Sequence, residues 1–161
     1  MKFYANCKTY EDLKKEYHRL ARLYHPDITG DQETMKIVNN EYDIMFLRLK
    51  DVHVNKDGEY YNKATTDTAD TFKDIINSII HFVDVTIEVC GSWIWVSGNT
   101  RIYRDDFKKL GFFWSQNKAA WYWHSPEEIR KFRKTPVDMN VIRNMYGSEI
   151  VNNEPYQAIA Q

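Results

Sequence analysis

The stretch from Thr9 to Lys50, TYEDLKKEYHRLARLYHPDITGDQETMKIVNNEYDIMFLRLK, decides the first part of the fold. Its first half carries apolar residues at helical spacing, and a proline interrupts that pattern at position 26. Because the residue before a proline is pushed out of the α-helical region, the first helix should end at His25. A short polar loop with Gly30 follows, and a second amphipathic pattern runs to Lys50. The stretch therefore predicts two antiparallel helices joined by a tight loop.

The first of these helices has a clear start and two different faces. Thr9 is a good N-cap, and Asp12 completes a capping box. At about 100° per residue one stripe is apolar: Leu13, Tyr17, Leu20, Ala21 and Tyr24. The opposite stripe is basic: Lys14, Lys15, His18, Arg19 and Arg22. The ordinary interpretation of such a stripe is a solvated face, and the alternative is a docking surface.

The second helix should begin after Asp31, its predicted N-cap. One face gathers its large apolar residues: Met35, Val38, Tyr42, Met45, Phe46 and Leu49. This face should pack against the first helix, with Tyr17, Tyr24 and Tyr42 between them. Ile37, Ile44 and Leu47 lie on the far side of the helix, so we expect another part of the chain, or a second copy, to pack there.

The tripeptide His25-Pro26-Asp27, placed between these two patterned helices, resembles the HPD motif of J-domains, the DnaJ-type modules that activate DnaK-type chaperones. The resemblance implies that the loop and the basic stripe dock on the chaperone, whose own site hydrolyses ATP. Asp27 can accept charge-assisted hydrogen bonds from a partner arginine, Pro26 fixes the bend, and His25 offers two ring nitrogens. The implied chaperone-binding residues are His25, Pro26, Asp27, Lys14, Lys15, His18, Arg19 and Arg22.

The sequence departs from the J-domain pattern on both sides of this stretch. Only residues 1–8 precede it, without the short YxxLG-type helix that the family has, and the usual fourth helix after Lys50 is not evident. The resemblance thus covers about a quarter of the chain. Since two helices alone bury too little apolar surface to be stable, a later segment must replace the missing helix.

Composition limits the class of protein. A chain of 161 residues with 43% apolar and 28% charged residues should fold as one or two small domains, and its net charge of -1 indicates no class of partner. No leader peptide and no apolar run of about 20 residues is evident. The two cysteines, Cys7 and Cys90, form no CxxC pattern, which indicates reduced thiols in a cytoplasmic protein. Without a recognisable catalytic or metal-binding motif, we expect neither enzyme activity nor a cofactor.

A connector, residues 51–68, should follow the J-like hairpin, residues 1–50. Within it the Asp57-Gly58 dipeptide favours either a small exposed hairpin or a plain loop. Residues 69–82 form a helical pattern whose apolar stripe is Phe72, Ile75, Ile76, Ile79 and Ile80. This helix should cover the second apolar face of the J-like hairpin or, alternatively, pack on the sheet that follows.

The remaining chain predicts a β-β-α-β-β-α module. Strands are expected at 84–90, 93–97, 112–114 and 120–123, with helices at 103–110 and 126–133. We expect an antiparallel sheet with its helices on one face, which makes the whole chain α+β. The helix at 69–82 and this module form the predicted domain 69–135, and residues 136–161 should hold a short helix ended by Gly147 and a loosely ordered tail.

This module is rich in aromatic and basic residues. Between residues 101 and 134 there are nine Lys or Arg against four Asp or Glu. Exposed aromatics beside a basic surface can stack on single-stranded nucleic acid. Alternatively, the tryptophans form the core of a small sheet and the lysines solvate its rim. The possible target-binding residues are Trp93, Trp95, Trp114, Trp121, Trp123, Arg101, Arg104 and Lys118.

Two functions follow from the sequence. The stretch GSWIWVSGNT together with LGFFWSQNKAAWYW resembles a module that follows truncated J-domains in phage and mobile-element proteins. The first function is a co-chaperone that stimulates a DnaK-type chaperone while the module binds a client or target. The second is a mobile-element adaptor or inhibitor that binds nucleic acid or a host protein and uses the J-like hairpin only as a scaffold. No membrane partner is expected.

Overall fold

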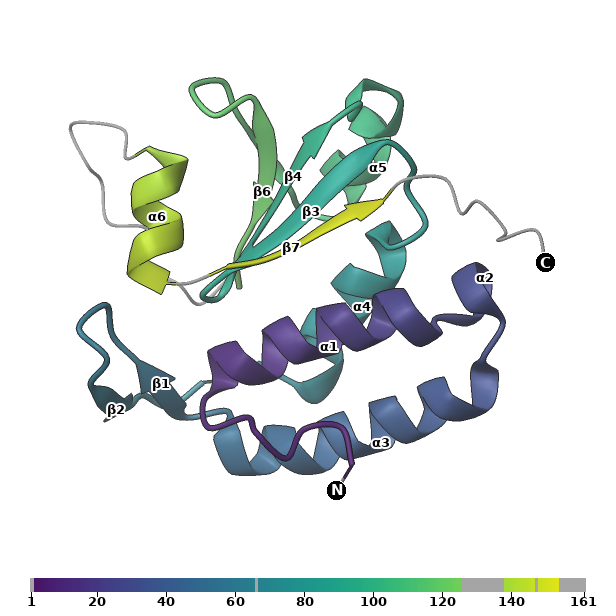
Figure 1. Cartoon of the computed structure of the whole chain (residues 1–161). Helices are drawn as coiled ribbons and strands as arrows, with labels where there is room; N and C mark the ends of the chain where they lie inside the picture. The colour runs from purple at the N-terminus through teal and green to yellow at the C-terminus, as the bar shows by residue number, and fades with distance from the viewer. Residues whose placement is uncertain (1, 66, 126–137, 147, 154–161) are drawn as a thin grey trace.

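A computed structural model of the chain describes residues 2–65, 67–125, 138–146 and 148–153. A layer of helices formed by α1 (Tyr10–Tyr24) and α3 (Gln32–Leu49) lies beside a twisted antiparallel sheet, and α4 (Ala69–Ile79) lies close to both (Figure 1). This arrangement confirms the α+β class. One continuous apolar core joins the helices to one face of the sheet.

The two helices of the hairpin begin and end as the sequence predicts. The Thr9 hydroxyl accepts a hydrogen bond from the Asp12 backbone N–H at 3.1 Å, and the Asp12 carboxylate accepts one from the Thr9 N–H at 3.1 Å. The Asp31 carboxylate accepts from the Thr34 N–H at 3.0 Å and so caps α3. These caps satisfy backbone donors that have no partner inside a helix.

Tyrosines fill the space between α1 and α3. Tyr17 and Tyr42 are fully buried, and their rings meet edge to face with centroids 4.9 Å apart. The segment before α1 adds Tyr4, whose ring packs on Tyr42 and whose hydroxyl donates to the Val38 carbonyl at 3.2 Å. Phe72 of α4 packs on Tyr17 from another side. The N-terminal segment and α4 thus supply apolar cover for the hairpin.

After α3 the chain forms a small hairpin of β1 (Val52–Val54) and β2 (Tyr60–Asn62). Gly58 takes a φ of 81° in its turn, a conformation that glycine adopts without strain, so the hairpin alternative is the correct one. The prediction that α4 covers the second apolar face of the hairpin was wrong, because Ile37, Ile44 and Leu47 are exposed. The helix instead packs between α1 and the C-terminal module. Phe72 contacts the hairpin, while Phe82, just beyond the helix, packs edge to face on Phe107 of the C-terminal module.

The sheet has five described strands in the order β5-β6-β4-β3-β7. Their bounds are β3 Val85–Cys90, β4 Trp93–Gly98, β5 Phe113–Ser115, β6 Ala120–Trp123 and β7 Ser148–Asn153. The first four confirm the predicted strands within about one residue. The fifth corrects the prediction of a loose tail, because Ser148–Asn153 pairs with β3 along its whole length. The short alternating segment EIVNN was too polar to be recognised as a strand without its partner.

Helices lie on both faces of this sheet, and the expectation of one covered face was wrong. On one face, α5 (Arg104–Lys109, after the short 3₁₀ turn Arg101–Tyr103) packs its Phe107 ring on Trp121. On the other face, α6 (Met139–Tyr146) places Met139 and Ile142 against a cluster around Trp95 and Tyr122. Strand alternation produced two apolar faces, and each needs a cover.

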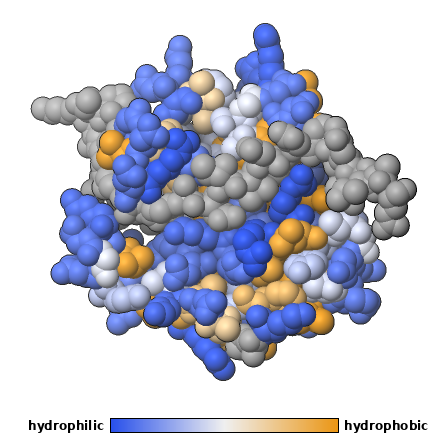
Figure 2. Space-filling view, viewed as in Figure 1, coloured by the Kyte–Doolittle hydropathy of each residue, from blue (hydrophilic) through white to orange (hydrophobic). Residues whose placement is uncertain are grey.

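The outward side of α3 also differs from expectation. Ile37, Ile44 and Leu47 are all exposed, Leu47 to 74%, and no segment in the described ranges covers them. Figure 2 shows apolar patches over the helical half of the molecule within a largely hydrophilic surface. The predicted helix at 126–133 and residues 154–161 lie outside the described residues. Within the described part, no helix is long and apolar enough to cross a bilayer, and no group of three metal-ligating side chains forms.

Candidate functional site: the hairpin tip and the surface of α1

The HPD motif forms the start of a one-turn helix, α2 (Pro26–Thr29), where the sequence predicted a loop. His25 is extended, with φ -61° and ψ 132°, as the following proline demands. Pro26 occupies the first helical position, which prolines favour, and Gly30 ends the turn with a φ of 74°. The turn therefore holds the tip in a defined shape between α1 and α3.

The three residues of the motif differ in their exposure. Pro26 is exposed, and 69% of the Asp27 side chain is open to solvent. Only 12% of the His25 side chain is exposed. Its Nδ1 accepts a hydrogen bond from the Asp27 backbone N–H at 3.2 Å. A partner can thus reach the Asp27 carboxylate directly, whereas the His25 ring is turned toward the protein.

The surroundings of His25 favour its neutral form. Burial lowers the pKa of the ring, and so does the neighbouring His81, while Asp27 and the side chain of Asn77 act in the opposite direction. The net direction is a lowered pKa, so the ring is neutral at pH 7.

Two residues of the predicted basic docking stripe are buried, and their assignment to a docking surface was wrong. Lys14 is 1% exposed, with its Nζ 4.2 Å from the centre of the Tyr10 ring and 5.4 Å from that of Phe72. His18 is fully buried, and burial lowers the pKa of its ring to about 4. Neither ring nitrogen of His18 has a hydrogen-bond partner among the described residues.

The position of α1 explains this burial. One side of the helix packs on α3, and the opposite side lies against α4 and against β3 and β7 of the sheet (Figure 1). Lys15 and Arg22 at the border of this contact are half-buried. Arg19 is exposed, and its guanidinium contacts the Glu16 carboxylate at 2.5 Å. Of the predicted stripe, Lys15, Arg19 and Arg22 stay within reach of a partner.

The aromatic residues of the C-terminal module are mostly interior. Trp95, Trp121 and Trp123 are buried, so the prediction that they bind a target was wrong. The alternative interpretation, a tryptophan-rich sheet core, holds for these three residues because each face of the sheet is covered by helices. Trp93 is half-buried and stacks on Trp95 at 5.9 Å.

Two exposed aromatic side chains remain at the edge strand β5. Trp114 is 48% exposed there, and its neighbour Phe113, which the sequence did not select, is 58% exposed. Arg101 and Arg104 are exposed, and the half-buried Lys118 places its Nζ 5.4 Å from the ring centre of Trp95. Phe113 lies toward Tyr122 and Trp114 toward Trp121, so the two rings lie on opposite faces of the sheet. We name these two exposed rings the β5 surface.

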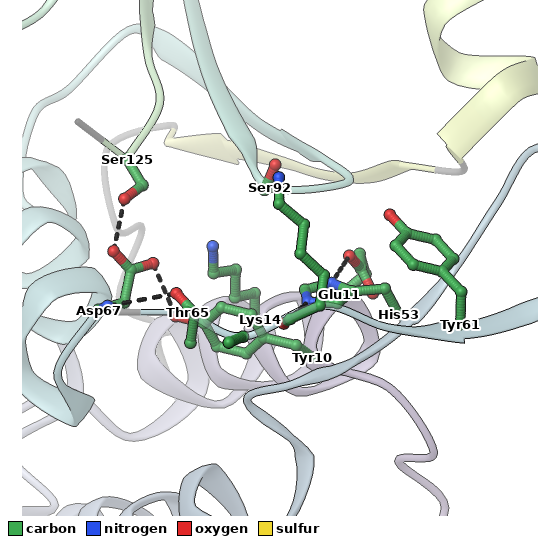
Figure 3. A pocket seen from close by; sticks show the side chains of 11 residues that line it. Tyr10, Glu11, Lys14, His53, Tyr61, Thr65, Asp67, Ser92 and Ser125 are labelled. Atoms are coloured by element: carbon green, nitrogen blue, oxygen red, sulfur yellow. Dashed lines mark hydrogen bonds and ion pairs between the residues drawn. The ribbon is translucent and has the colours of Figure 1, made fainter. Parts of the chain in front are cut away.

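A polar cavity of about 170 Å³ lies where the hairpin, the connector and the sheet meet (Figure 3). The His53 Nδ1 is 2.7 Å from a Glu11 carboxylate oxygen, and Asp67 hydrogen-bonds both Tyr10 and Ser125. The hydrogen bond to Glu11 raises the pKa of His53. No sequence pattern indicates this cluster, because its members come from segments far apart in the chain. We name these side chains, Tyr10, Glu11, His53, Asp67 and Ser125, the polar joint, because they link the helical hairpin to the connector and the sheet.

Comparison with known proteins finds partial similarity to DnaJ chaperones. The chain is 31% identical over 83 residues to "Chaperone protein DnaJ 1" of Aquifex aeolicus, which covers 50% of this chain and 21% of that protein. It is 35% identical over 77 residues to "Chaperone protein DnaJ" of Hydrogenobacter thermophilus, covering 44% and 21%. It is 47% identical over 38 residues to the DnaJ of Crocosphaera subtropica, covering 22% and 10%.

The chain therefore spans between a tenth and about a fifth of the length of these relatives. No protein-family model matches it, and no solved structure matches it. These partial similarities support a J-domain-like protein. The structure adds a hairpin whose tip exposes Pro26 and Asp27 to solvent.

Proposed function

We propose that the chain is a J-domain co-chaperone that docks on a DnaK-type chaperone and stimulates its ATP hydrolysis. The exposed Pro26 and Asp27 at the end of the hairpin carry this proposal, together with the partial similarity to DnaJ chaperones. Asp27 offers an exposed carboxylate to a partner arginine, and such charge-assisted pairs are the stronger class of hydrogen bond. The basic side chains of α1 that a partner can reach, Lys15, Arg19 and Arg22, add positive charge to the surface of this helix.

Single-turnover ATP hydrolysis by a bacterial DnaK-type chaperone tests the proposal. The full chain should accelerate hydrolysis. Asp27→Asn should abolish the acceleration because it removes the negative charge to which a partner arginine would bind. Asp57→Asn is the matched control, since Asp57 is an exposed aspartate in the β1-β2 turn, far from the tip in the chain. Unchanged hydrolysis across a wide concentration range, or equal acceleration by Asp27→Asn, contradicts the proposal. If the chain slows ATP hydrolysis by the chaperone, it is an inhibitor of the chaperone instead.

The β5 surface supports the second part of the proposal, binding of a client, a host protein or single-stranded nucleic acid. Exposed aromatic rings on an edge strand suit stacking on the bases of an extended single strand. Titration of tryptophan fluorescence with oligo(dT) should show binding that weakens with salt and is lost in Trp114→Ala. Absent or salt-independent binding rejects the nucleic-acid version and leaves protein targets. The phage or mobile-element source stays a prediction, because the matched relatives are cellular DnaJ chaperones.

A further inference from the structure

The outward side of α3 presents a row of side chains that no segment in the described ranges covers. Ile37 is 50% exposed, Ile44 47% and Leu47 74%, and the exposed Asn40 completes the row. The helix lies at the border of the molecule, and α1 separates it from the sheet (Figure 1). Because large aliphatic side chains are stabilised when they leave water, a row of them on an outer helix favours a partner.

The spacing of this row is that of a coiled-coil seam. Ile37, Asn40, Ile44 and Leu47 follow one another at intervals of three, four and three residues, which places them at positions a, d, a and d of a heptad repeat. Ile at a with Leu at d favours the pairing of two parallel helices. Tyr42, at position f, points to the opposite side and is buried in the hairpin core. A second helix can therefore pack on the seam without disturbing the fold of the chain.

The charges beside the seam match a parallel copy of the same helix. In a parallel pair, each g residue lies beside the e residue of the following heptad in the other helix. Lys36 at g thus meets Glu41 of the second copy, and Asp43 at g meets Arg48 of the second copy. Both contacts join opposite charges, and two-fold symmetry repeats each of them.

These charged side chains are open to a partner, and the acidic ones are already held in place. The side chain of Lys36 is 60% exposed and that of Asp43 48% exposed, while the exposed Arg48 forms no ion pair with any residue that the structure describes. The Glu41 carboxylate accepts backbone N–H groups of the N-terminal segment at 2.8–3.1 Å, and Lys73 of α4 holds Asp43 at 2.5 Å. Fixed carboxylates lose less conformational freedom when a basic side chain binds them.

We infer that the outward side of α3 binds a second copy of this chain, with the two α3 helices parallel. This pairing is independent of the co-chaperone function proposed above. Because α2 directly precedes α3, it places both hairpin tips at the same end of the dimer. A seam of three apolar side chains from each copy is smaller than a standard interface, so the dimer should form only at chain concentrations of about 0.1 mM or more.

An antiparallel pair fits the same side chains less well. The antiparallel alignment that keeps the apolar residues together has its two-fold axis near residue 42. Glu41 and Asp43 would then each lie near their own copies, and like charges repel. Asn40 would face Ile44 of the second copy, which leaves a covered amide without a hydrogen-bond partner, whereas in the parallel pair the two Asn40 amides face each other.

Analytical ultracentrifugation of the full chain between about 10 µM and about 1 mM should show an equilibrium between monomer and dimer. Arg48→Glu should raise the dissociation constant about tenfold, because it turns both contacts with Asp43 from attraction into repulsion. Lys56→Glu, the same charge change at an exposed position of the β1-β2 turn, is the control and should leave the dissociation constant unchanged. Ile44→Glu should abolish the dimer while circular dichroism shows an intact fold, since this side chain is half-exposed in the single chain.

Cysteine cross-linking tests the orientation of the helices. In a chain that also carries Cys7→Ser, Asn40→Cys places two thiols opposite each other in the parallel dimer, and mild oxidation should join them because they lie within disulfide reach. The other native thiol, Cys90, is buried, and Lys56→Cys in the same chain is the control that should stay uncross-linked.

Three results would overturn the inference. The first is a chain that stays monomeric at the highest concentration. The second is a dimer that neither Arg48→Glu nor Ile44→Glu weakens, because it uses another surface. The third is a dimer in which Asn40→Cys does not cross-link faster than Lys56→Cys, because its α3 helices are not parallel.

Discussion

The tip of the hairpin and the sheet-facing side of α1 carry the same kind of sequence signal but have opposite environments. Both are polar or basic and were expected to face solvent. At the tip, Pro26 and Asp27 do so. Along α1, Lys14 and His18 are buried beneath α4 and the sheet. A basic stripe on an amphipathic helix is thus solvated only if no later part of the chain packs against that side.

This difference limits how the proposed chaperone partner can approach. In the described arrangement a partner meets the open tip and the outer rim of α1, with Arg19 exposed and Lys15 and Arg22 half-buried. It cannot touch Lys14 or His18 unless the sheet moves away from α1. Removing the charge of Arg19 should therefore weaken docking, while the effects of Lys14 and His18 substitutions should appear in the free energy of unfolding.

The largest expected effect concerns the cover of the hairpin. Phe72→Ala should lower the free energy of unfolding by about 3–5 kcal/mol, because it removes a 1% exposed ring that packs between α1 and the core. Urea denaturation followed by circular dichroism measures the loss. Leu47→Ala on the open side of α3 is the control and should change stability by no more than about 0.5 kcal/mol. Equal losses would mean that α4 is not the cover of the hairpin.

The outcome at α1 shows where sequence reasoning succeeds. Local signals gave the helix caps at Thr9 and Asp31, the stop before Pro26 and most strands, because each depends on neighbours within a few residues. The face of α1 that packs on the sheet depends on β7, more than a hundred residues away in the chain, and its strand pattern is weak. The same limit applies to Trp95, whose burial depends on α6 covering the second face of the sheet.

The second prediction uses the pH dependence of stability to test whether the sheet-facing side of α1 is buried. In the folded chain the pKa of His18 is about 4, below its ordinary value of 6.5, so the unfolded chain binds more protons between these values. The His18 contribution to stability is present above pH 6.5 and lost as the pH falls toward 4. The shift is equivalent to about 3 kcal/mol at most. Urea denaturation at pH 7 and pH 4.5 measures this loss.

His18→Leu is the matched variant for that titration, since it keeps a side chain of similar bulk and cannot be protonated. It should show a smaller loss between pH 7 and pH 4.5 than the unaltered chain. His81→Leu, at an exposed histidine, should leave the pH dependence as it was. A pH dependence that His18→Leu does not reduce would mean that His18 is reached by water.

A third, smaller effect should appear with the same variant at constant pH 7. Both ring nitrogens of His18 lack a partner among the described residues, and a buried polar group without a hydrogen bond costs about 1–3 kcal/mol. His18→Leu should therefore raise the free energy of unfolding by about 1 kcal/mol, after allowance for imperfect fit. A loss of stability would show that the imidazole is hydrogen-bonded and that the sheet-facing side of α1 is as well packed as the core.

The smallest expected effect lies in the polar joint and runs in the opposite direction with pH. The hydrogen bond to Glu11 raises the pKa of His53 above 6.5, so this pair stabilises the fold at pH below 6.5 and loses that contribution as the pH rises through the raised value.

Glu11→Gln keeps the shape of the side chain and removes its charge. It should cost about 1 kcal/mol at pH 6 and less than about 0.5 kcal/mol at pH 9, where the ring is neutral in both proteins. NMR titration of His53 in the same variant should show its pKa falling toward the ordinary value. An equal cost at both pH values would mean that the joint is held by packing alone, and acid would then weaken the hairpin–sheet contact through His18 without any compensation from His53.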